Sequence, residues 1–479
     1  MRRSKLFAEP QARHDRSNRI GFHIRVAVLA LAACACLAAV GIPASAATWW
    51  TSNLGSDSGS CGTSAAPCRS ISQAIANAAD GDTIWVGPGH YGDVNGDGNF
   101  TGPGDEQPDP TAGEPNLAAG PYGCIVCVTK ALHIYSTGGA AVTVIEANAS
   151  TGSASTVMIL HDGGDFGAVD HGFTITGGNA NGVMVAPYYA GSNFSVSQNM
   201  TVMGNIDVGD GVGFNVQGLG WHKICPAPYC QFTARILVAS NRAINNQTGF
   251  AVAPYYWQDW YGQFVVRDNE AVGATTGFFI SPGTQDEIGN YNARDVQVVN
   301  NIAAHNGTGF YVDVVGLVSY NTALDNSQSG FTVTPSGGPF ETNSAIGNGG
   351  PGVIVDLSNN GWGPGITLNP ADVFSTFSNN NFFGNDRKRP AGLSFEGGWN
   401  PGPSAHCGVL NLGLVAASPA VPTQLQAANN YWGSSKGPSS TGPGDNAGGV
   451  CDQNGATTNT KPFSASPAGS TVTPTVLEN

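Results

Sequence analysis

Residues 241–252 read NRAINNQTGFAV, and four more segments repeat the pattern. Each begins Asn-x-Ala and continues, eight or nine residues after the Asn, with a Gly and a short apolar strand. The other copies are N269EAVGATTGFFI, N301IAAHNGTGFYV, N321TALDNSQSGFTV and N343SAIGNGGPGVIV, with a looser copy at N205IDVGDGVGFNV. A repeat of this length with one short strand cannot bury its own apolar face, but it can do so by stacking on its neighbours.

Aligning the copies places like residues in columns. One column holds Phe250, Phe278, Phe310 and Phe331, and another, two residues on, holds Val252, Ile280, Val312 and Val333. Stacked coils would put these side chains above one another in the interior, and the asparagine column would form a ladder of amide hydrogen bonds. The sequence therefore predicts an all-β fold, a parallel β-helix solenoid.

Two further stretches carry a family resemblance. C68RSISQAIANAADGDTIWVGPGHYGD and N429NYWGSSKGP, with the repeats, resemble the right-handed parallel β-helix, pectate-lyase-like superfamily, including its secreted repeat proteins. The resemblance implies a short helix that caps the N-terminal end of the coil. Ser70 is the expected N-cap, and the helix is expected to end at Asp80-Gly81. The superfamily includes lyases, hydrolases, epimerases and adhesins, so it fixes the fold and leaves the activity open.

The N-terminal segment has the order of a secretory signal. A basic region precedes the apolar run VAVLALAACACLAAVGI and the small-residue site that ends at Ala46. A lipoprotein signal at Cys34 is the alternative. We predict a signal peptide (1–46), an N-terminal cap and first strand (47–92), an inserted Gly/Asp-rich loop (93–120), the β-helix (121–465) and a tail (466–479).

Charge limits the partners. Without residues 1–46 the chain keeps 12 basic and 31 acidic residues. Such a surface repels nucleic acid and anionic lipid, so we expect neither nucleic acid nor membrane as a partner after signal cleavage. The expected location is extracellular, periplasmic or at the cell surface, and the expected state is a monomer.

The mature chain has eight cysteines, which in an exported protein favours disulfides over a zinc site. Proximity in the sequence suggests the pairs Cys61 with Cys68, Cys225 with Cys230, and Cys407 with Cys451. In an extended strand, Cys124 and Cys127 would lie roughly 10 Å apart, beyond disulfide reach. Either the chain bends there or these two cysteines have other partners.

Extra residues between repeats follow the Gly-aromatic strands and are rich in aromatic side chains. Insertions at one phase of a solenoid emerge on one side, which is often the binding side. Aromatic faces with polar edges suit sugar rings, so a polysaccharide is the expected partner. The alternative is that these rings pack on one another to order long loops. The candidate carbohydrate-binding residues are Tyr188, Tyr189, Trp221, Tyr255, Tyr256, Trp257, Trp260 and Tyr261.

No catalytic signature decides the activity. A β-eliminating lyase would need calcium-binding carboxylates in successive coils, and the columns before and after the repeated strands show no acidic ladder. A hydrolase would need two carboxylates at a suitable separation, for which Asp259, Asp286 and Glu287 are weak candidates. A polysaccharide lyase or glycoside hydrolase and a non-enzymatic surface, structural or adhesin-like protein therefore both stay open.

The inserted loop contains D93VNGDGNFTGPGDE, whose first seven positions match an EF-hand-type calcium loop. Position twelve, where that loop has a bidentate Glu, is Gly104, and acids follow as Asp105 and Glu106. We expect a structural calcium ion here. Its expected ligands are Asp93, Asn95, Asp97, the Asn99 carbonyl and Asp105.

Overall fold

The computed structural model describes residues 46–93, 105–108, 123–147, 155–161, 163–178, 180–185, 199–216, 235–252, 263–281, 295–314, 316–335, 338–356, 374–386, 406–413, 424–438, 448–453 and 455–469. The chain divides into two units, residues Met1–Ala46 and residues Ala47–Asn479, and the sheets belong to the second unit. Residues 1–45 of the predicted signal peptide lie outside the described residues. In those ranges, no helix combines the length and apolar character needed to cross a bilayer.

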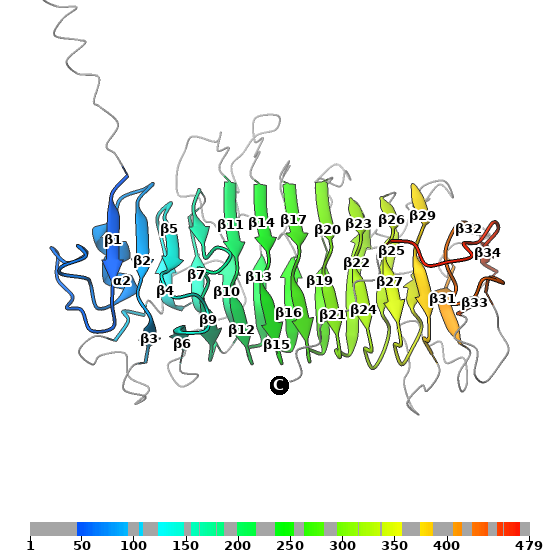
Figure 1. Cartoon of the computed structure of the whole chain (residues 1–479), viewed down its shortest axis with the longest axis horizontal. Coiled ribbons are helices and arrows are strands. Elements are labelled where there is room, and N and C mark those ends of the chain that lie inside the picture. The colour runs from blue at the N-terminus through cyan, green and yellow to red at the C-terminus, as the bar shows by residue number, and fades with distance from the viewer. Residues whose placement is uncertain are drawn as a thin grey trace, which may run out of the picture. The chain divides into compact units, whose positions relative to one another are not determined.

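Three parallel sheets make up the described chain, together with one helix and a small two-stranded sheet (Figure 1). Sheet 1 contains β1 (Thr48–Thr51), β2 (Thr83–Val86), β5 (His133–Ser136), β8 (Asp165–Phe166), β11 (Asn199–Met203), β14 (Arg235–Ala239), β17 (Gln263–Arg267), β20 (Asp295–Val299), β23 (Leu317–Ser319), β26 (Pro339–Glu341) and β29 (Thr376–Ser378). Sheet 2 contains β3 (Gly89–Gly92), β6 (Thr143–Glu146), β9 (Thr174–Thr176), β12 (Ile206–Val208), β15 (Arg242–Ile244), β18 (Glu270–Val272), β21 (Ile302–Ala304), β24 (Thr322–Leu324), β27 (Ser344–Ile346) and β30 (Asn381–Phe383). Sheet 3 contains β4 (Cys124–Val128), β7 (Ser155–Ile159), β10 (Asn181–Val185), β13 (Val212–Val216), β16 (Thr248–Val252), β19 (Thr276–Ile280), β22 (Thr308–Val314), β25 (Phe331–Pro335), β28 (Val353–Val355), β31 (Cys407–Asn411) and β33 (Gly449–Asp452), and β32 (Gln424–Gln426) pairs with β34 (Thr457–Asn459).

The chain visits the sheets in a fixed order, from sheet 1 to sheet 2 to sheet 3, and then returns to sheet 1 one coil further on. Long connections interrupt the described chain at the return from sheet 3 to sheet 1, for example between β13 and β14 and between β19 and β20. The first coil carries its insertion elsewhere, between β3 of sheet 2 and β4 of sheet 3. The acidic insertion and the aromatic insertions therefore leave the coil at different corners.

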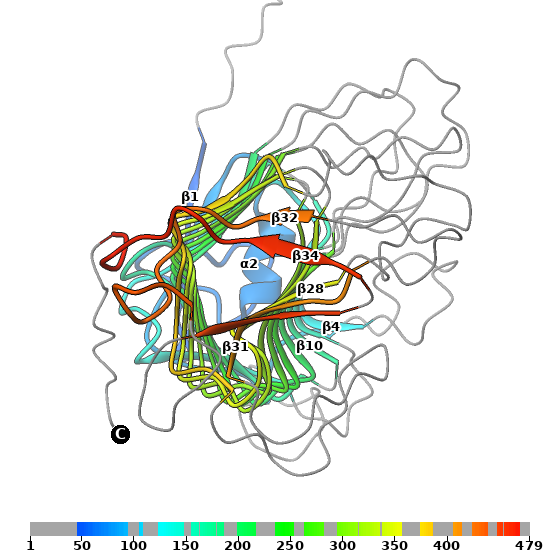
Figure 2. The same ribbon diagram turned by 90° about the vertical axis from the view of Figure 1, so that its right-hand side faces the viewer.

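The interior is filled by columns of like side chains, as the repeats predict. Phe214, Phe250, Phe278, Phe310 and Phe331 stack in sequence on the inner face of sheet 3, with successive ring centroids 4.9, 4.7, 4.7 and 4.7 Å apart. Figure 2, which views the coil end-on, shows the three sheets surrounding this interior. The aromatic column buries apolar area in each coil and adds the stacking preference of the rings.

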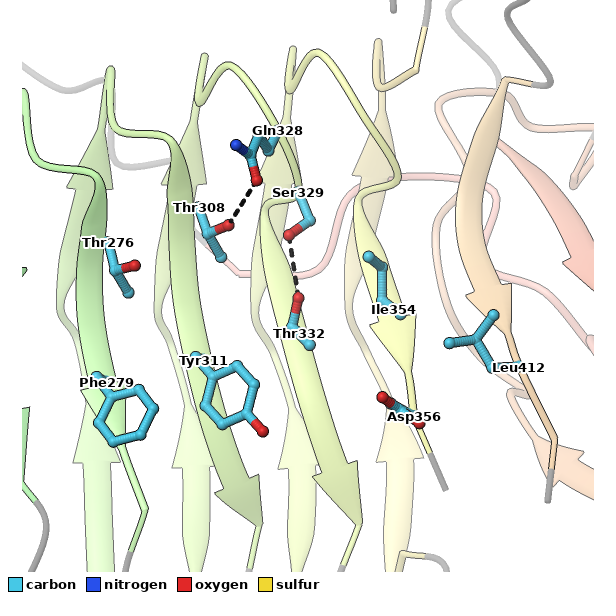
Figure 3. Close-up of a pocket in the computed structure, with 10 residues that line it drawn as sticks. All are labelled: Thr276, Phe279, Thr308, Tyr311, Gln328, Ser329, Thr332, Ile354, Asp356 and Leu412. Carbon is cyan, nitrogen blue, oxygen red and sulfur yellow. Dashed lines mark hydrogen bonds between the residues drawn. The ribbon is translucent and has the colours of Figure 1, made fainter. Parts of the chain in front are cut away.

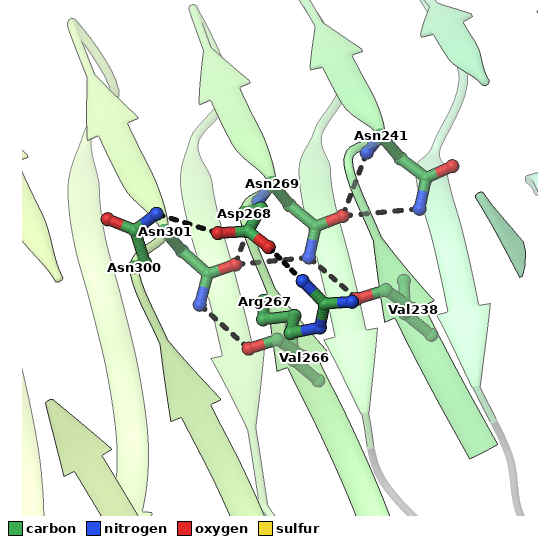
Figure 4. A network of polar contacts seen from close by, with 8 residues as sticks. All are labelled: Val238, Asn241, Val266, Arg267, Asp268, Asn269, Asn300 and Asn301. Carbon is green, nitrogen blue, oxygen red and sulfur yellow. Dashed lines mark hydrogen bonds and ion pairs between the residues drawn. The ribbon is translucent and has the colours of Figure 1, made fainter. Parts of the chain in front are cut away.

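Buried asparagines form a ladder at the turn from sheet 1 to sheet 2. Asn269 donates through Nδ2 to the Val238 carbonyl (2.9 Å) and to Asn301 Oδ1 (3.0 Å), as Figure 4 shows. The residue before each asparagine turns the chain with a positive φ, 58° at Asp268 and 55° at Asn300. The ladder contains Asn205, Asn241, Asn269, Asn301, Asn321, Asn343, Asn380 and Asn430.

A second polar ladder, which the repeat alignment did not identify, runs along the turn from sheet 2 to sheet 3. Asn306, Asn326, Asn348 and Asn385 repeat the same geometry, each Nδ2 binding a carbonyl of the preceding coil. Ala274 interrupts this ladder, although its backbone N–H still donates to Asn306 Oδ1 (2.8 Å). The two ladders satisfy the polar groups of two tight corners that are excluded from water.

The predicted capping helix is α2 (Ile71–Asn77). Ser70 accepts a hydrogen bond from the Gln73 backbone N–H (3.1 Å), which is the expected N-cap. The helix ends before Asp80-Gly81, where the backbone becomes extended at Ala78, and the Lys130 ammonium donates to carbonyls at this C-terminal end. Ile71, Ala74 and Ile75 are buried and join the interior core, so the helix closes its first coil (Figure 2).

The N429NYWG motif closes the other end of the core. Asn430 Oδ1 accepts from the Asn380 backbone N–H (2.8 Å) and so extends the first ladder by one position. Trp432 is fully buried, with its ring centroid 5.2 Å from that of Phe382. The motif thus supplies both the last ladder residue and a large apolar plug.

Two of the cysteine pairs suggested by the sequence are present as disulfides, Cys61–Cys68 and Cys407–Cys451. Cys124 and Cys127 also form a disulfide, with Cα atoms 5.4 Å apart, so of the two alternatives the bent chain is correct. Residues three apart in an extended strand would have Cα atoms roughly 10 Å apart, so the shorter distance shows that β4 bends at this point. Cys225 and Cys230 lie outside the described residues.

Candidate functional site

A groove of about 340 Å³ lies on the outer face of sheet 3 (Figure 3). It crosses the ends of β19, β22, β25 and β28, next to the corner from which the 282–294 and 357–373 connections leave. The groove is lined by Thr276, Phe279, Thr308, Tyr311, Gln328, Ser329, Thr332, Ile354, Asp356 and Leu412.

Two aromatic rings form the floor of this sheet 3 groove. Phe279 and Tyr311 are cross-strand partners in β19 and β22, and their rings stack with centroids 5.1 Å apart and an interplanar angle of 16°. Their neighbours Phe278 and Phe310 are fully buried, so Phe279 and Tyr311 point to the outside of the sheet. Together they present a flat apolar surface that runs from coil to coil.

Polar side chains border the rings. Thr276 and Thr308 are cross-strand partners, and the Thr308 hydroxyl donates to Gln328 Oε1 (3.4 Å). The hydroxyl groups of Ser329 and Thr332 share a hydrogen bond (3.1 Å). Hydroxyl and amide groups beside an aromatic floor can both donate to and accept from a polyhydroxylated ligand.

One carboxylate lines the groove among the described residues. Asp356 directly follows β28, and its backbone N–H donates to the Val333 carbonyl (3.0 Å), which fixes the start of the next connection. The residue is 3 % exposed. A hydrolase would require a second carboxylate, and none lines the described part of the groove.

The floor of this groove is not among the site residues predicted from the sequence. The repeat columns place Phe278 and Phe310 in the interior and leave the aromatic residue that follows each of them unassigned. In FFI and FYV the middle residue must face outward if both flanking residues face inward. That alternation was the available signal.

Comparisons with known proteins find distant structural similarities only. No protein-family model and no curated protein matches the chain. Among solved structures, the A-modules of the Azotobacter vinelandii mannuronan C-5 epimerases AlgE4 and AlgE6 are similar at 14% and 13% identity, with TM-scores of 0.37 and 0.34. They cover 81% of this chain in both cases, and 90% and 92% of their own lengths. A rhamnogalacturonan lyase is similar at 10% identity and a TM-score of 0.29, over 70% of this chain and 87% of that one.

The chain is a parallel β-helix protein. Its three stacked parallel sheets confirm the fold predicted from the repeats and the resemblance drawn from the two end motifs. At identities of 10–14% and TM-scores below 0.5, the similarities bear on neither the substrate nor the mechanism of this β-helix.

The aromatic and acidic residues expected to form the site lie outside the described residues. The weak catalytic candidates among them are Asp259, Asp286 and Glu287. The candidate carbohydrate-binding residues are Tyr188, Tyr189, Trp221, Tyr255, Tyr256, Trp257, Trp260 and Tyr261.

The acidic insertion is described at its two ends. Asp93 and Asp105 are both buried, while Asn95, Asp97 and Asn99 lie outside the described residues. The Glu106 backbone N–H donates to the Gly92 carbonyl (3.2 Å), which brings the two ends of the insertion together.

Glu106 has a different partner, the start of the capping helix. Its carboxylate accepts from the backbone N–H groups of Ile71 and Ser72 (both 2.8 Å) and from the Ser72 hydroxyl (2.6 Å). Burial raises the pKa of Glu106, while these three donors favour its charged form. The residue therefore ties the end of the insertion to the cap.

A group formed by Asp57, Cys61 and Cys68 has metal-ligand chemistry but no free thiolates. The two cysteines are joined in a disulfide, and Asp57 Oδ1 accepts from the backbone N–H groups of Arg69 (2.6 Å) and Ser70 (2.9 Å). These contacts order the turn before the capping helix.

An acidic pair lies inside the coil, where the other repeats have apolar or amide residues. Asp207 occupies the column of Ala243, and Asp210 the position of Asn246 in the second ladder. A Cβ atom placed on Gly182 would lie 1.5 Å from Asp207 Oδ2 and 2.8 Å from Asp210 Oδ2, so both carboxyl groups pack against the same glycine.

The two carboxyl groups are almost excluded from water, at 0 % and 3 % exposure. Burial, reinforced by the neighbouring Asp210, raises the pKa of Asp207 well above its usual range. Burial also raises the pKa of Asp210, to about 6. The looser repeat copy at 205–216 could have shown this pair, because Asp207 aligns with the repeated alanine.

Proposed function

We propose that this β-helix is a secreted protein that binds an extracellular polysaccharide along the sheet 3 groove. The observation that carries the proposal is the stacked pair Phe279 and Tyr311, set among hydroxyl and amide groups on the outer face of parallel strands. Aromatic floors with polar borders suit the apolar face and the hydroxyl groups of a sugar ring.

The repeat supports a polymeric ligand. Successive coils of a parallel sheet are about 4.8 Å apart, so the same kind of contact recurs along the helix axis. The groove crosses several coils and would accommodate a chain rather than a single compact metabolite. Three disulfides among the described residues are typical of an exported protein and support the proposed location.

The test is a binding screen with acidic and neutral polysaccharides, with and without calcium. The Tyr311→Ala variant should bind the best ligand about ten-fold more weakly, equivalent to about 1.4 kcal/mol. Tyr320→Ala is the matched control, because Tyr320 is also aromatic and is 58% exposed but lies outside the groove. Equal binding by the wild type and Tyr311→Ala would refute the proposal, as would no binding across the screen.

The same incubations report on turnover. Unsaturated products would identify a lyase, shortened saturated products a hydrolase, and binding without products a lectin-like protein. Absence of both binding and products would favour the structural or adhesin-like alternative.

We also propose that the acidic insertion holds a structural calcium ion through Asp93, Asn95, Asp97, Asn99 and Asp105. The burial of Asp93 and Asp105 and the junction between the two ends of the insertion support this. Calcium should raise the melting temperature of the wild type and have no effect on Asp97→Ala. Glu106→Gln distinguishes calcium binding from the contact between Glu106 and the capping helix. This variant should lower the melting temperature equally with and without calcium. A wild-type melt unchanged by calcium would overturn the assignment.

A further inference from the structure

The outer face of sheet 1 carries a row of rings at its N-terminal end. Trp85 in β2 and Tyr135 in β5 are cross-strand partners with centroids 5.3 Å apart. His171 meets Trp85 edge-on at 5.4 Å, and His133 lies parallel to Tyr135 at 6.5 Å. Both neighbours of Trp85 in β2 are fully buried, so this row faces away from the core.

Asp165 in β8 accepts hydrogen bonds from two residues of this row. Its Oδ2 accepts from His133 Nδ1 (2.7 Å) and from the Tyr135 hydroxyl (2.8 Å). Partial burial and the bond to Asp165 raise the pKa of Tyr135, which keeps its hydroxyl protonated as a donor. We call Trp85, His133, Tyr135, Asp165 and His171 the sheet 1 platform.

Several polar atoms of the platform have no partner in the described part of the chain. Both bonds to Asp165 converge on Oδ2, which leaves Oδ1 open. His133 Nδ1 bonds to Asp165, so its Nε2 has no partner there and is an acceptor when the ring is neutral. His171 Nδ1 donates to the Ser136 carbonyl (2.9 Å), which leaves its Nε2 in the same position. The side chains of His133 and Asp165 are 37% and 29% exposed, so a ligand can reach them.

We propose that the sheet 1 platform binds an uncharged sugar ring of a glycan. The Trp85 and Tyr135 rings supply a surface for the apolar face of the sugar, as aromatic residues do in many ligand sites. The open acceptors on Asp165, His133 and His171 match hydroxyl groups, which are donors. A sugar acid fits poorly, because its carboxylate would face that of Asp165. The platform lies on a different sheet from the sheet 3 groove and does not depend on it.

The test titrates the full mature chain with neutral hexasaccharides of β-1,4-glucan, β-1,4-mannan and β-1,4-xylan, and with a mannuronate hexasaccharide, by calorimetry. At least one neutral hexasaccharide should bind. Trp85→Ala should weaken its binding about ten-fold, equivalent to about 1.4 kcal/mol, and Tyr135→Phe should weaken it more modestly by releasing Asp165. Leu237→Ala, a half-buried residue on the outer face of β14, is the matched control and should bind normally.

Three results would overturn the proposal: no binding of any neutral hexasaccharide, unchanged binding by both Trp85→Ala and Tyr135→Phe, or a Trp85-dependent preference for the mannuronate hexasaccharide. Tyr311→Ala separates the two surfaces. This variant should leave sugar binding at the sheet 1 platform unchanged, whether or not the sheet 3 groove binds a ligand. The two proposals can therefore fail independently.

Discussion

Replacing Asp210 by asparagine should stabilise this protein at neutral and alkaline pH. In the folded protein, the pKa of Asp210 rises from 3.8 to about 6, and that of Asp207 rises well above its usual range. Between the unfolded and folded pKa values, the folded state holds more protons than the unfolded state. The free energy of unfolding therefore falls as the pH rises through this window.

The magnitude follows from the shift. A rise of about two pKa units in Asp210 corresponds to a loss of roughly 3 kcal/mol between pH 4 and pH 8. Asp210→Asn removes this titrating carboxyl group and the charge that helps to raise the pKa of Asp207. The variant should match the wild type near pH 4 and exceed its stability at pH 8 by about 2 to 3 kcal/mol.

Urea denaturation of both proteins at several pH values measures this difference. Asp325→Asn is the control, because it makes the same chemical change at an exposed residue and should alter neither stability nor its pH dependence. If Asp210→Asn and the wild type lost stability in parallel between pH 5 and pH 8, the buried pair would not be the cause.

Two further substitutions test the packing of the coils. Asn301→Ala should lower the free energy of unfolding in urea by about 2 to 4 kcal/mol, because it leaves the backbone and side-chain donors of Asn269 buried without the Asn301 acceptor. A decrease below about 0.5 kcal/mol, the size of an ordinary surface effect, would contradict a stabilising role for the ladder. Gly309→Ala should lower the melting temperature, because its Cβ would lie 2.5 Å from the Gly330 carbonyl oxygen, whereas Gly59→Ala, with nothing within 4 Å, should not. Equal melting temperatures for the two glycine variants would show that the coils can separate at no cost.

The repeats predict much of this architecture for a physical reason. Columns such as Phe250, Phe278 and Phe310 repeat because every coil must bury an apolar side chain at the same position. Residues one repeat apart in the sequence are therefore in contact. The capping helix and the N429NYWG plug were also predictable, since each end of a solenoid must be closed. The second ladder was missed because it is less regular, with Ala274 interrupting it and glycines sharing its turn.

The binding surfaces were harder to predict because they depend on which side of a strand faces water. The outward direction of Phe279 and Tyr311 follows from alternation within β19 and β22, but only once those strands are placed. The sheet 1 platform joins residues from three coils, and no local motif links Trp85 to His171. The disulfide between Cys124 and Cys127 likewise required a bend that a regular strand does not have.

A crystal structure of this β-helix with the tightest-binding oligosaccharide of the polysaccharide screen would show directly whether the sheet 3 groove binds sugar. We expect a sugar ring stacked on Phe279 and Tyr311, with hydroxyl groups hydrogen-bonded to the Thr and Gln side chains that border them. An oligosaccharide bound only elsewhere, with the sheet 3 groove unoccupied, would contradict it.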